Sequence, residues 1–179
     1  MHLNDQQLLK WMVESGMGIS SSIHIHHQNR DAIIAYRHKV PIIDLGQTLE
    51  NWRIFLALFH KIQSESGNIG FMMDKLSIAR YGNWIESNGN WTLLSSQWKP
   101  GTFTNPKKNM NLDLILFFQL ANLDQQSAAL EAKKLSIPSA GFISSDINPN
   151  LVDYSFLANT ESFGSLDLFL QMLLHVKKN

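Results

Sequence analysis

Short apolar runs of strand length alternate along most of this chain with longer segments in which apolar residues recur at helical spacing. Strands that alternate with helices of this kind indicate right-handed βαβ crossovers and a mostly parallel sheet. A chain of 179 residues is long enough to bury one such core. The pattern therefore predicts an α/β fold with a doubly wound, mostly parallel sheet flanked by helices. The expected strands are Val40–Leu45, Asn68–Met73, Trp91–Ser95, Leu112–Phe118, Ile137–Ser144 and Tyr154–Ala158.

The helices between these runs have recognisable starts. Thr48 offers an N-cap for the helix after the first strand, and Asp124 offers one for the helix after the fourth. A weaker helix is expected over 74–86, and the last helix, over 162–177, carries an apolar stripe at helical spacing.

The chain shows no internal repeat and no low-complexity linker. We expect residues 1–39 to form an amino-terminal helix and an extended arm. Residues 40–179 should then form a single α/β domain.

The composition limits the classes of function. Lys and Arg together number 15, and so do Asp and Glu, so no global basic field indicates a nucleic-acid partner. The chain has no Cys, which excludes disulfides and Cys-based zinc sites. Its apolar runs are shorter than a bilayer span, so no membrane association is expected. Charge therefore has to be interpreted locally.

The motifs that mark catalysis or cofactor binding are missing from the sequence. It contains neither of the glycine-rich phosphate motifs GxGxxG and GxxxxGK[ST], and no GxSxG nucleophile motif. Asp113 and Asp153 are single acids near strand starts, and a single acid is not a catalytic set. We predict no catalytic residues, no cofactor and no enzymatic activity.

The stretch HIHHQNR, which begins at His24, has the residue types of a metal site. His24 and His26 would share one face of an extended segment, and His27 would lie opposite. A zinc site needs further ligands in a fixed frame, and none is apparent. The favoured interpretation is a polar segment that could contact an anion or a phosphate, without a metal.

Two local clusters favour RNA. Residues 91–110 contain no acid, and Trp98 and Phe103 there add flat apolar faces to lysines and hydroxyl groups. Residues of these types in one loop suit contacts to phosphates and unpaired bases, although each cluster alone is also typical of a solvated surface. The second cluster lies around Asp31. The predicted RNA-binding residues are Arg30, Arg37, His38, Lys39, Lys75, Lys99, Thr102, Thr104, Asn105, Lys107 and Lys108.

The segment EAKKLSIPSAGFISSDINPNLVDYSFLANTES, residues 131–162, resembles the signature of the family of small-subunit ribosomal protein S2. Two further blocks resemble the same family and occur in the same order. The matching residues are Ile42, Ile43, Asp44, Leu45 and Thr48 in VPIIDLGQTL; Trp98, Gly101, Thr102, Thr104 and Asn105 in WKPGTFTN; and Glu131, Ala132, Lys134, Leu135, Ile137, Pro138, Asp146, Asn148, Pro149, Leu151, Val152, Asp153, Tyr154 and Asn159 in the long segment.

The chain departs from the family pattern in three places. The family's amino-terminal GVHFGHxxRRWNPK segment corresponds here to the degraded GMGISSSIHIHHQNR. The acidic-Pro-Arg turn is replaced by residues 121–123, and PKKNMN stands where bacterial members insert a long coiled-coil hairpin. RNA contacts of those segments are not carried over.

The resemblance implies a flavodoxin-like sheet and a structural constituent of the small ribosomal subunit. Such a protein would bind rRNA and neighbouring ribosomal proteins, would not be a free homo-oligomer, and would have no enzymatic activity. The reduced, charge-neutral form suggests a mitochondrial ribosome in the matrix. Two alternatives are an α/β enzyme that binds a small molecule or sugar phosphate, and a non-ribosomal interaction paralogue.

Overall fold

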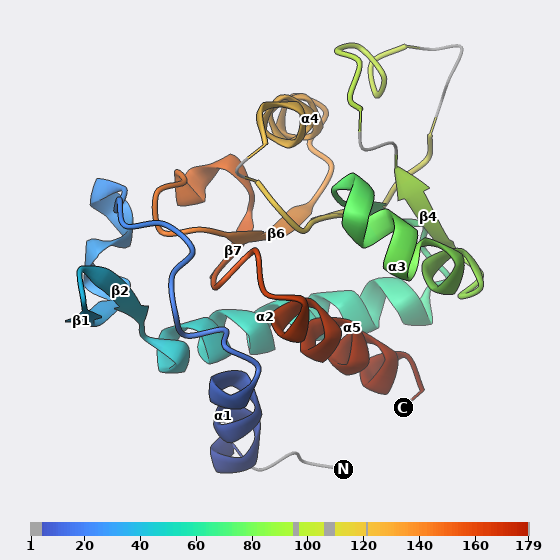
Figure 1. The fold of residues 1–179 in the computed structure, drawn as a ribbon. Coiled ribbons are helices and arrows are strands. Elements are labelled where there is room, and N and C mark those ends of the chain that lie inside the picture. The colour runs from blue at the N-terminus through green and yellow to red at the C-terminus, as the bar shows by residue number, and fades with distance from the viewer. Residues whose placement is uncertain (1–4, 95–96, 106–109, 121, 179) are drawn as a thin grey trace.

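A parallel β-sheet with helices on both faces forms the centre of the molecule (Figure 1). The structure is a computed structural model that describes residues 5–94, 97–105, 110–120 and 122–178. The five strands, all paired in parallel, lie in the order β4-β3-β5-β6-β7. This is the strand order of a flavodoxin-like, doubly wound sheet, and it confirms the predicted fold class. The strands are β3 (Ile69–Met72), β4 (Trp91–Leu94), β5 (Leu114–Phe117), β6 (Ser139–Ile143) and β7 (Tyr154–Leu157).

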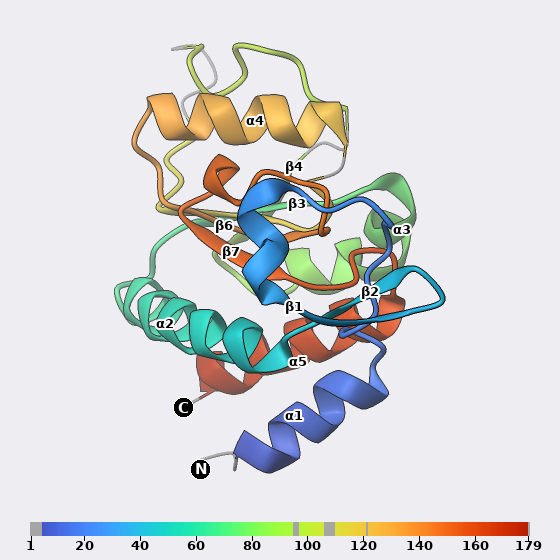
Figure 2. The same cartoon turned by 90° about the vertical axis from the view of Figure 1, so that its left-hand side faces the viewer.

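The helices divide between the two faces of the sheet. One hydrophobic cluster contains residues of α1 (Asp5–Glu14), α2 (Leu45–Ser64), α3 (Lys75–Glu86) and α5 (Phe163–Lys178). A second cluster contains the buried alanines of α4 (Leu123–Lys134). Figure 2 shows α4 on one side of the sheet and α2, α5 and α1 on the other. Among the described residues, no helix is long and apolar enough to cross a membrane.

The central strands supply both clusters. In β5, Leu114 and Leu116 pack into the first cluster, whereas Ile115 and Phe117 pack into the second. Successive side chains of a strand point to opposite faces, so a strand covered on both faces must be apolar throughout. This burial explains why the strands were visible in the sequence as short continuous apolar runs.

The first predicted strand lies outside the parallel sheet. β2 (Val40–Ile43) pairs antiparallel with β1 (Ile33–Arg37), a strand that the sequence analysis did not predict. His38 and Lys39 connect them with φ angles of 49° and 69°, as a two-residue hairpin turn with two left-handed residues requires. The first four residues of the predicted run Val40–Leu45 therefore form a strand, but this strand builds a peripheral hairpin, and Leu45 already belongs to α2.

Both predicted N-caps were wrong, and each lies after the observed cap, by four residues in α2 and by two in α4. The helix α2 begins at Leu45, because the side chain of Asp44 accepts a hydrogen bond from the Gly46 N–H at 2.9 Å. The cap of α4 is Asn122, whose side chain accepts from the Asp124 N–H at 3.0 Å. An earlier polar residue takes the cap in both cases, and Thr48 and Asp124 lie inside their helices.

Candidate nucleic-acid interface

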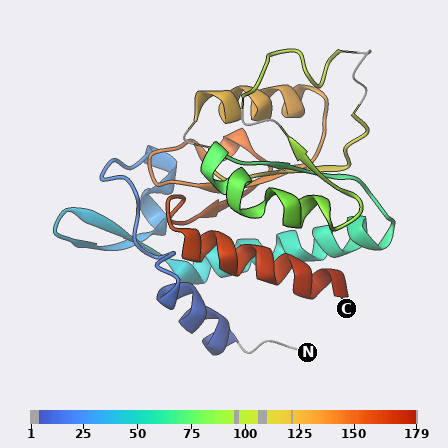
Figure 3. The ribbon, with the colours of Figure 1, turned by 45° about the vertical axis from the view of Figure 1, so that its right-hand side comes forward.

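The structure places most of the predicted RNA-binding residues in two regions, and Lys75 lies apart from both, at the start of α3. Residues 97–105 follow β4 and pack beside α4. The second cluster lies on the hairpin of β1 and β2, except for Arg30, which lies in the short 3-10 helix η1 (His27–Ala32) just before β1. Figures 1 and 3 place the loop and the hairpin at opposite sides of the domain. The two clusters therefore do not form one continuous surface. Lys107 and Lys108 lie outside the described residues.

The loop 97–105 is organised by Glu131 of α4, a residue that the sequence analysis treated only as a family mark. The side chain of Glu131 is 8% exposed, and both of its oxygens accept hydrogen bonds from the loop. Oε2 accepts from Trp98 Nε1 at 3.2 Å and from the Gly101 N–H at 3.1 Å. Oε1 accepts from the Phe103 N–H at 3.0 Å, and from the N–H and hydroxyl of Thr104 at 2.9 and 3.0 Å.

These contacts lower the pKa of the Glu131 carboxyl. Burial alone would raise the pKa of this carboxyl, but hydrogen bonds from Thr104, Gly101 and Phe103 outweigh burial and hold the pKa below its ordinary value. The carboxylate is therefore ionised at neutral pH, and it holds one loop conformation. The available sequence signal was a Glu near the small residues Ala128 and Ala132. The partners of this Glu could not be inferred from it, because they are about 30 residues away in the chain.

The prediction that Trp98 and Phe103 present flat faces to bases was wrong. The two residues are 7% and 8% exposed, and their ring centroids lie 4.4 Å apart within the second hydrophobic cluster. The hydroxyl of Thr102 donates to the Lys99 carbonyl at 2.6 Å, and that of Thr104 donates to Glu131. The groups that the loop exposes to solvent include the side chains of Lys99 and Asn105.

In contrast to the rings of the loop 97–105, the cations of the second cluster are exposed to solvent. Arg30, Arg37, His38 and Lys39 are all exposed. Ion pairs in the described part of the chain join Lys10 to Glu14, Arg53 to Asp5 and Arg80 to Asp167, so the four residues of the second cluster form none there. Lys75, at the first position of α3, is also exposed. The hairpin tip therefore offers positive charge that forms no ion pair with the described part of the protein.

The carboxyl ends of β6 and β7 are covered by the chain's own arm. The switch point of this sheet, where doubly wound folds commonly bind ligands, lies between β3 and β5. The Ser145 carbonyl accepts hydrogen bonds from the His26 N–H at 2.8 Å and from Asn29 Nδ2 at 3.0 Å. The Asn159 N–H donates to the Met17 carbonyl at 3.0 Å. The loops after β6 and β7, which are rich in Asn, Asp and Ser, thus hold residues 15–29 in place.

Asp153 hydrogen-bonds to Ser139, and His26 and His27 lie against each other. The Asp153 carboxylate accepts hydrogen bonds from the N–H and the hydroxyl of Ser139, both at 2.9 Å, and so joins the starts of β6 and β7. The ring centroids of His26 and His27 are 4.3 Å apart. No group of three or more potential metal ligands occurs among the residues that the structure describes.

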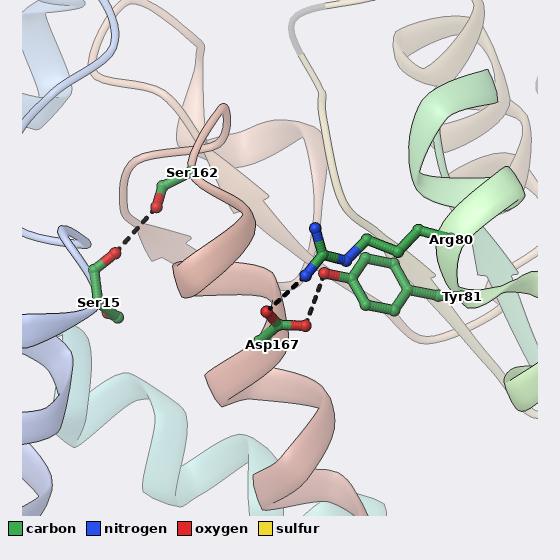
Figure 4. A network of polar contacts seen from close by, with 5 residues as sticks. All are labelled: Ser15, Arg80, Tyr81, Ser162 and Asp167. Atoms are coloured by element: carbon green, nitrogen blue, oxygen red, sulfur yellow. Dashed lines mark hydrogen bonds and ion pairs between the residues drawn. The ribbon is translucent and has the colours of Figure 1, made fainter.

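Figure 4 shows how α5 is fastened to its neighbours. Asp167 accepts a hydrogen bond from the Tyr81 hydroxyl at 2.7 Å and pairs with Arg80 at 3.3 Å, while the Ser162 hydroxyl donates to the Ser15 carbonyl at 2.9 Å. Burial and the neighbouring Asp167 carboxylate raise the pKa of Tyr81 to about 12. These polar contacts join α3 and the arm to α5.

The fold and these surroundings define a flavodoxin-like α/β protein with exposed cationic groups on two sides. The family model for Ribosomal protein S2 matches residues 108–178. The small ribosomal subunit protein uS2m of Schizosaccharomyces pombe is 25% identical over 189 residues, which cover 88% of this chain and 72% of that protein. The small ribosomal subunit protein uS2 of Buchnera aphidicola is 24% identical over 215 residues, which cover 90% and 88%. The chain is thus similar to proteins of the ribosomal protein S2 family over most of its length, in agreement with the resemblance of its motifs.

Proposed function

We propose that this protein is a structural constituent of the small subunit of the mitochondrial ribosome, and that it acts by position rather than by catalysis. The observation that carries the proposal is its similarity, over most of its length, to a uS2m protein. Similarity to the S2 family supports a structural role in the small subunit. The mitochondrial assignment rests on the uS2m relative and on the reduced, charge-neutral sequence.

In this proposal the protein contacts rRNA at two separate places. His38 and Lys39 at the hairpin tip and Arg30 just before β1 meet phosphates on one side, and Lys99 on the loop held by Glu131 meets phosphates on the other. Phosphate contacts position a protein without reading sequence, and a preorganised loop loses little entropy when it binds. Because the net charge is zero, neighbouring proteins supply much of the docking area.

Sedimentation of the full chain tests the proposal. We expect a tagged copy to co-sediment with small subunits from mitochondria and to remain bound at moderate salt, since few phosphate contacts give a shallow salt dependence. The double substitution Lys39→Glu and Lys99→Glu should reduce incorporation, whereas Lys10→Glu, an exposed position on α1, should leave it unchanged. A chain found only as a free species at the top of the gradient would refute the ribosomal role and favour a non-ribosomal interaction paralogue.

A further inference from the structure

The small sheet formed by the hairpin has an open edge. Among the described residues, β1 pairs with β2 and with no other strand, while the far side of β2 is met by a single bridge between Ile19 and Ile42. An open strand edge presents unpaired N–H and C=O groups, which can pair with another chain. β1 therefore ends this sheet in a form that can accept a further strand.

The register shows which backbone groups face that edge. Arg37 and Val40 flank the two-residue turn, so they form the hydrogen-bonded pair that closes the hairpin. The next pair, Tyr36 with Pro41, is then a pair without hydrogen bonds, which agrees with the lack of an N–H on Pro41. The N–H and C=O of Tyr36 therefore point away from β2, toward the open edge.

Exposed apolar side chains accompany this edge. Ile34 and Tyr36 of β1 are 65% and 64% exposed. Ile34 also lines an apolar groove of about 280 Å³, together with Val13 of α1 and Ile19, which are 65% and 50% exposed. The groove extends from Ile34 across Ile42 and Ile43 of β2 to Ile19. Single exposed apolar residues are ordinary, but an apolar groove that reaches the strand at an open sheet edge suits an extended peptide.

We propose that the β1 edge and this groove dock an extended segment of a neighbouring protein in the small subunit. The segment adds as a strand beside β1, pairs with the outward groups of Tyr36, and places a large aliphatic or aromatic side chain in the groove. The inference rests on the proposed function, because the partner is a neighbour within the ribosome. It is separate from the rRNA contacts, which involve the hairpin tip.

The chemistry of the surface identifies the kind of segment. Arg37, at the end of β1, is exposed and cationic, and Asp31 is the acid nearest to it in the sequence, so a carboxylate on the segment complements it. An apolar anchor with a nearby Asp or Glu therefore matches both the groove and the charge. RNA would supply phosphates for the cations, but it offers no ladder partner for Tyr36 and no aliphatic group for Ile34 and Val13.

Site-specific photo-crosslinking in assembled subunits tests this proposal. Tyr36 is replaced by p-benzoylphenylalanine in the full chain, small subunits are isolated and irradiated, and the adducts are identified by mass spectrometry. We expect one peptide of a neighbouring ribosomal protein, with an apolar anchor next to a carboxylate. Ile34→Asp should reduce that adduct about tenfold or more, because it places a charge in the groove. The matched control Ile54→Asp, at a 61% exposed position on α2, should leave it unchanged.

A second variant tests the strand pairing itself. In a chain with the crosslinker at Ile34 instead, Tyr36→Pro removes the outward N–H without removing a hydrogen bond to β2, and it should also reduce the adduct. Adducts to rRNA alone, no adduct, or equal losses in Ile34→Asp and Ile54→Asp would each overturn the proposal. Failure of the chain to sediment with subunits would instead count against the proposed function, so the two failures are distinguishable.

Discussion

Replacing Glu131 with Gln tests the idea that one buried carboxylate shapes the loop 97–105. Glutamine has the size of glutamate but only one accepting oxygen. In its better orientation that oxygen keeps the three donors from Phe103 and Thr104, and the amide N–H groups face Trp98 Nε1 and the Gly101 N–H. Two donors then lose their acceptor and meet other donors.

The magnitude follows from those two donors. A buried donor without a partner costs about 1–3 kcal/mol, so the pair would cost about 2–6 kcal/mol if no water reached it. Gly101 is exposed, so water can replace part of its lost hydrogen bond, whereas the Trp98 side chain is buried. We therefore expect Glu131→Gln to lower the free energy of unfolding by about 3 kcal/mol.

The assay combines urea unfolding with amide hydrogen exchange. The amides of Gly101, Phe103 and Thr104 should exchange much faster in the variant, while amides of β5 and β6 keep most of their protection. Glu50→Gln, at an exposed position on α2, is the matched control and should change little. If the loop amides were as protected as in the wild type and stability changed by less than about 0.5 kcal/mol, the role of Glu131 would be refuted.

The same carboxylate has a defined pH dependence. The pKa of Glu131 is lower in the folded protein than its ordinary value of 4.5, so the carboxylate stabilises the fold fully above that pH. This stabilisation should be lost as the pH falls from about 4.5 through the lower, folded-state pKa. Urea unfolding over a pH series should show the loss in the wild type and a smaller one in Glu131→Gln.

Three other substitutions test contacts that hold the arm and helices in place. Gly164→Ala would put a Cβ atom 2.7 Å from the Ser15 carbonyl, so limited proteolysis should cut residues 15–29 faster while the sheet stays intact. Tyr81→Phe should cost about 1 kcal/mol at neutral pH. Because the pKa of Tyr81 is raised from 10.0 to about 12, wild-type stability should fall between pH 10 and 12, and the variant should lack this component of the fall when both are unfolded by urea. Thr48→Val leaves a buried carbonyl of β7 without its 2.8 Å hydrogen bond and should lower stability by about 1–3 kcal/mol in thermal unfolding, whereas Thr92→Val, at an exposed site, should not.

The local sequence was sufficient to predict most of the helices and strands, but it was not sufficient to predict the residues at which the helices begin. Strands β3, β5 and β6 were predicted because burial on both faces leaves a continuous apolar run that is visible without any partner. The caps were predicted poorly, since Asp44 and Thr48 both have side chains suited to an N-cap. In the fold, Thr48 instead donates to the Leu157 carbonyl, a contact that exists only after β7 has packed against α2.

The predicted RNA-binding loop also shows the difference between what local sequence predicts and what packing decides. Lys99, Trp98 and Phe103 are neighbours in a segment without acids, so residue type alone suggested one shared RNA surface. Packing separates them: α4 buries the two rings, while the lysine stays exposed. Burial of a side chain depends on what lies opposite it, and a local segment carries no record of that neighbour.

The sequence by itself determined the α/β class, the positions of the parallel strands and the resemblance to the S2 family, because each depends on residue types and their order within short segments. Only the tertiary structure decided that β2 belongs to a peripheral hairpin, that the arm covers the ends of β6 and β7, and that Glu131 organises the loop 97–105. Each of these features joins groups that are distant in the chain, or depends on which strand becomes a neighbour. Folding alone brings such groups within hydrogen-bonding distance, and their free energy depends on that proximity.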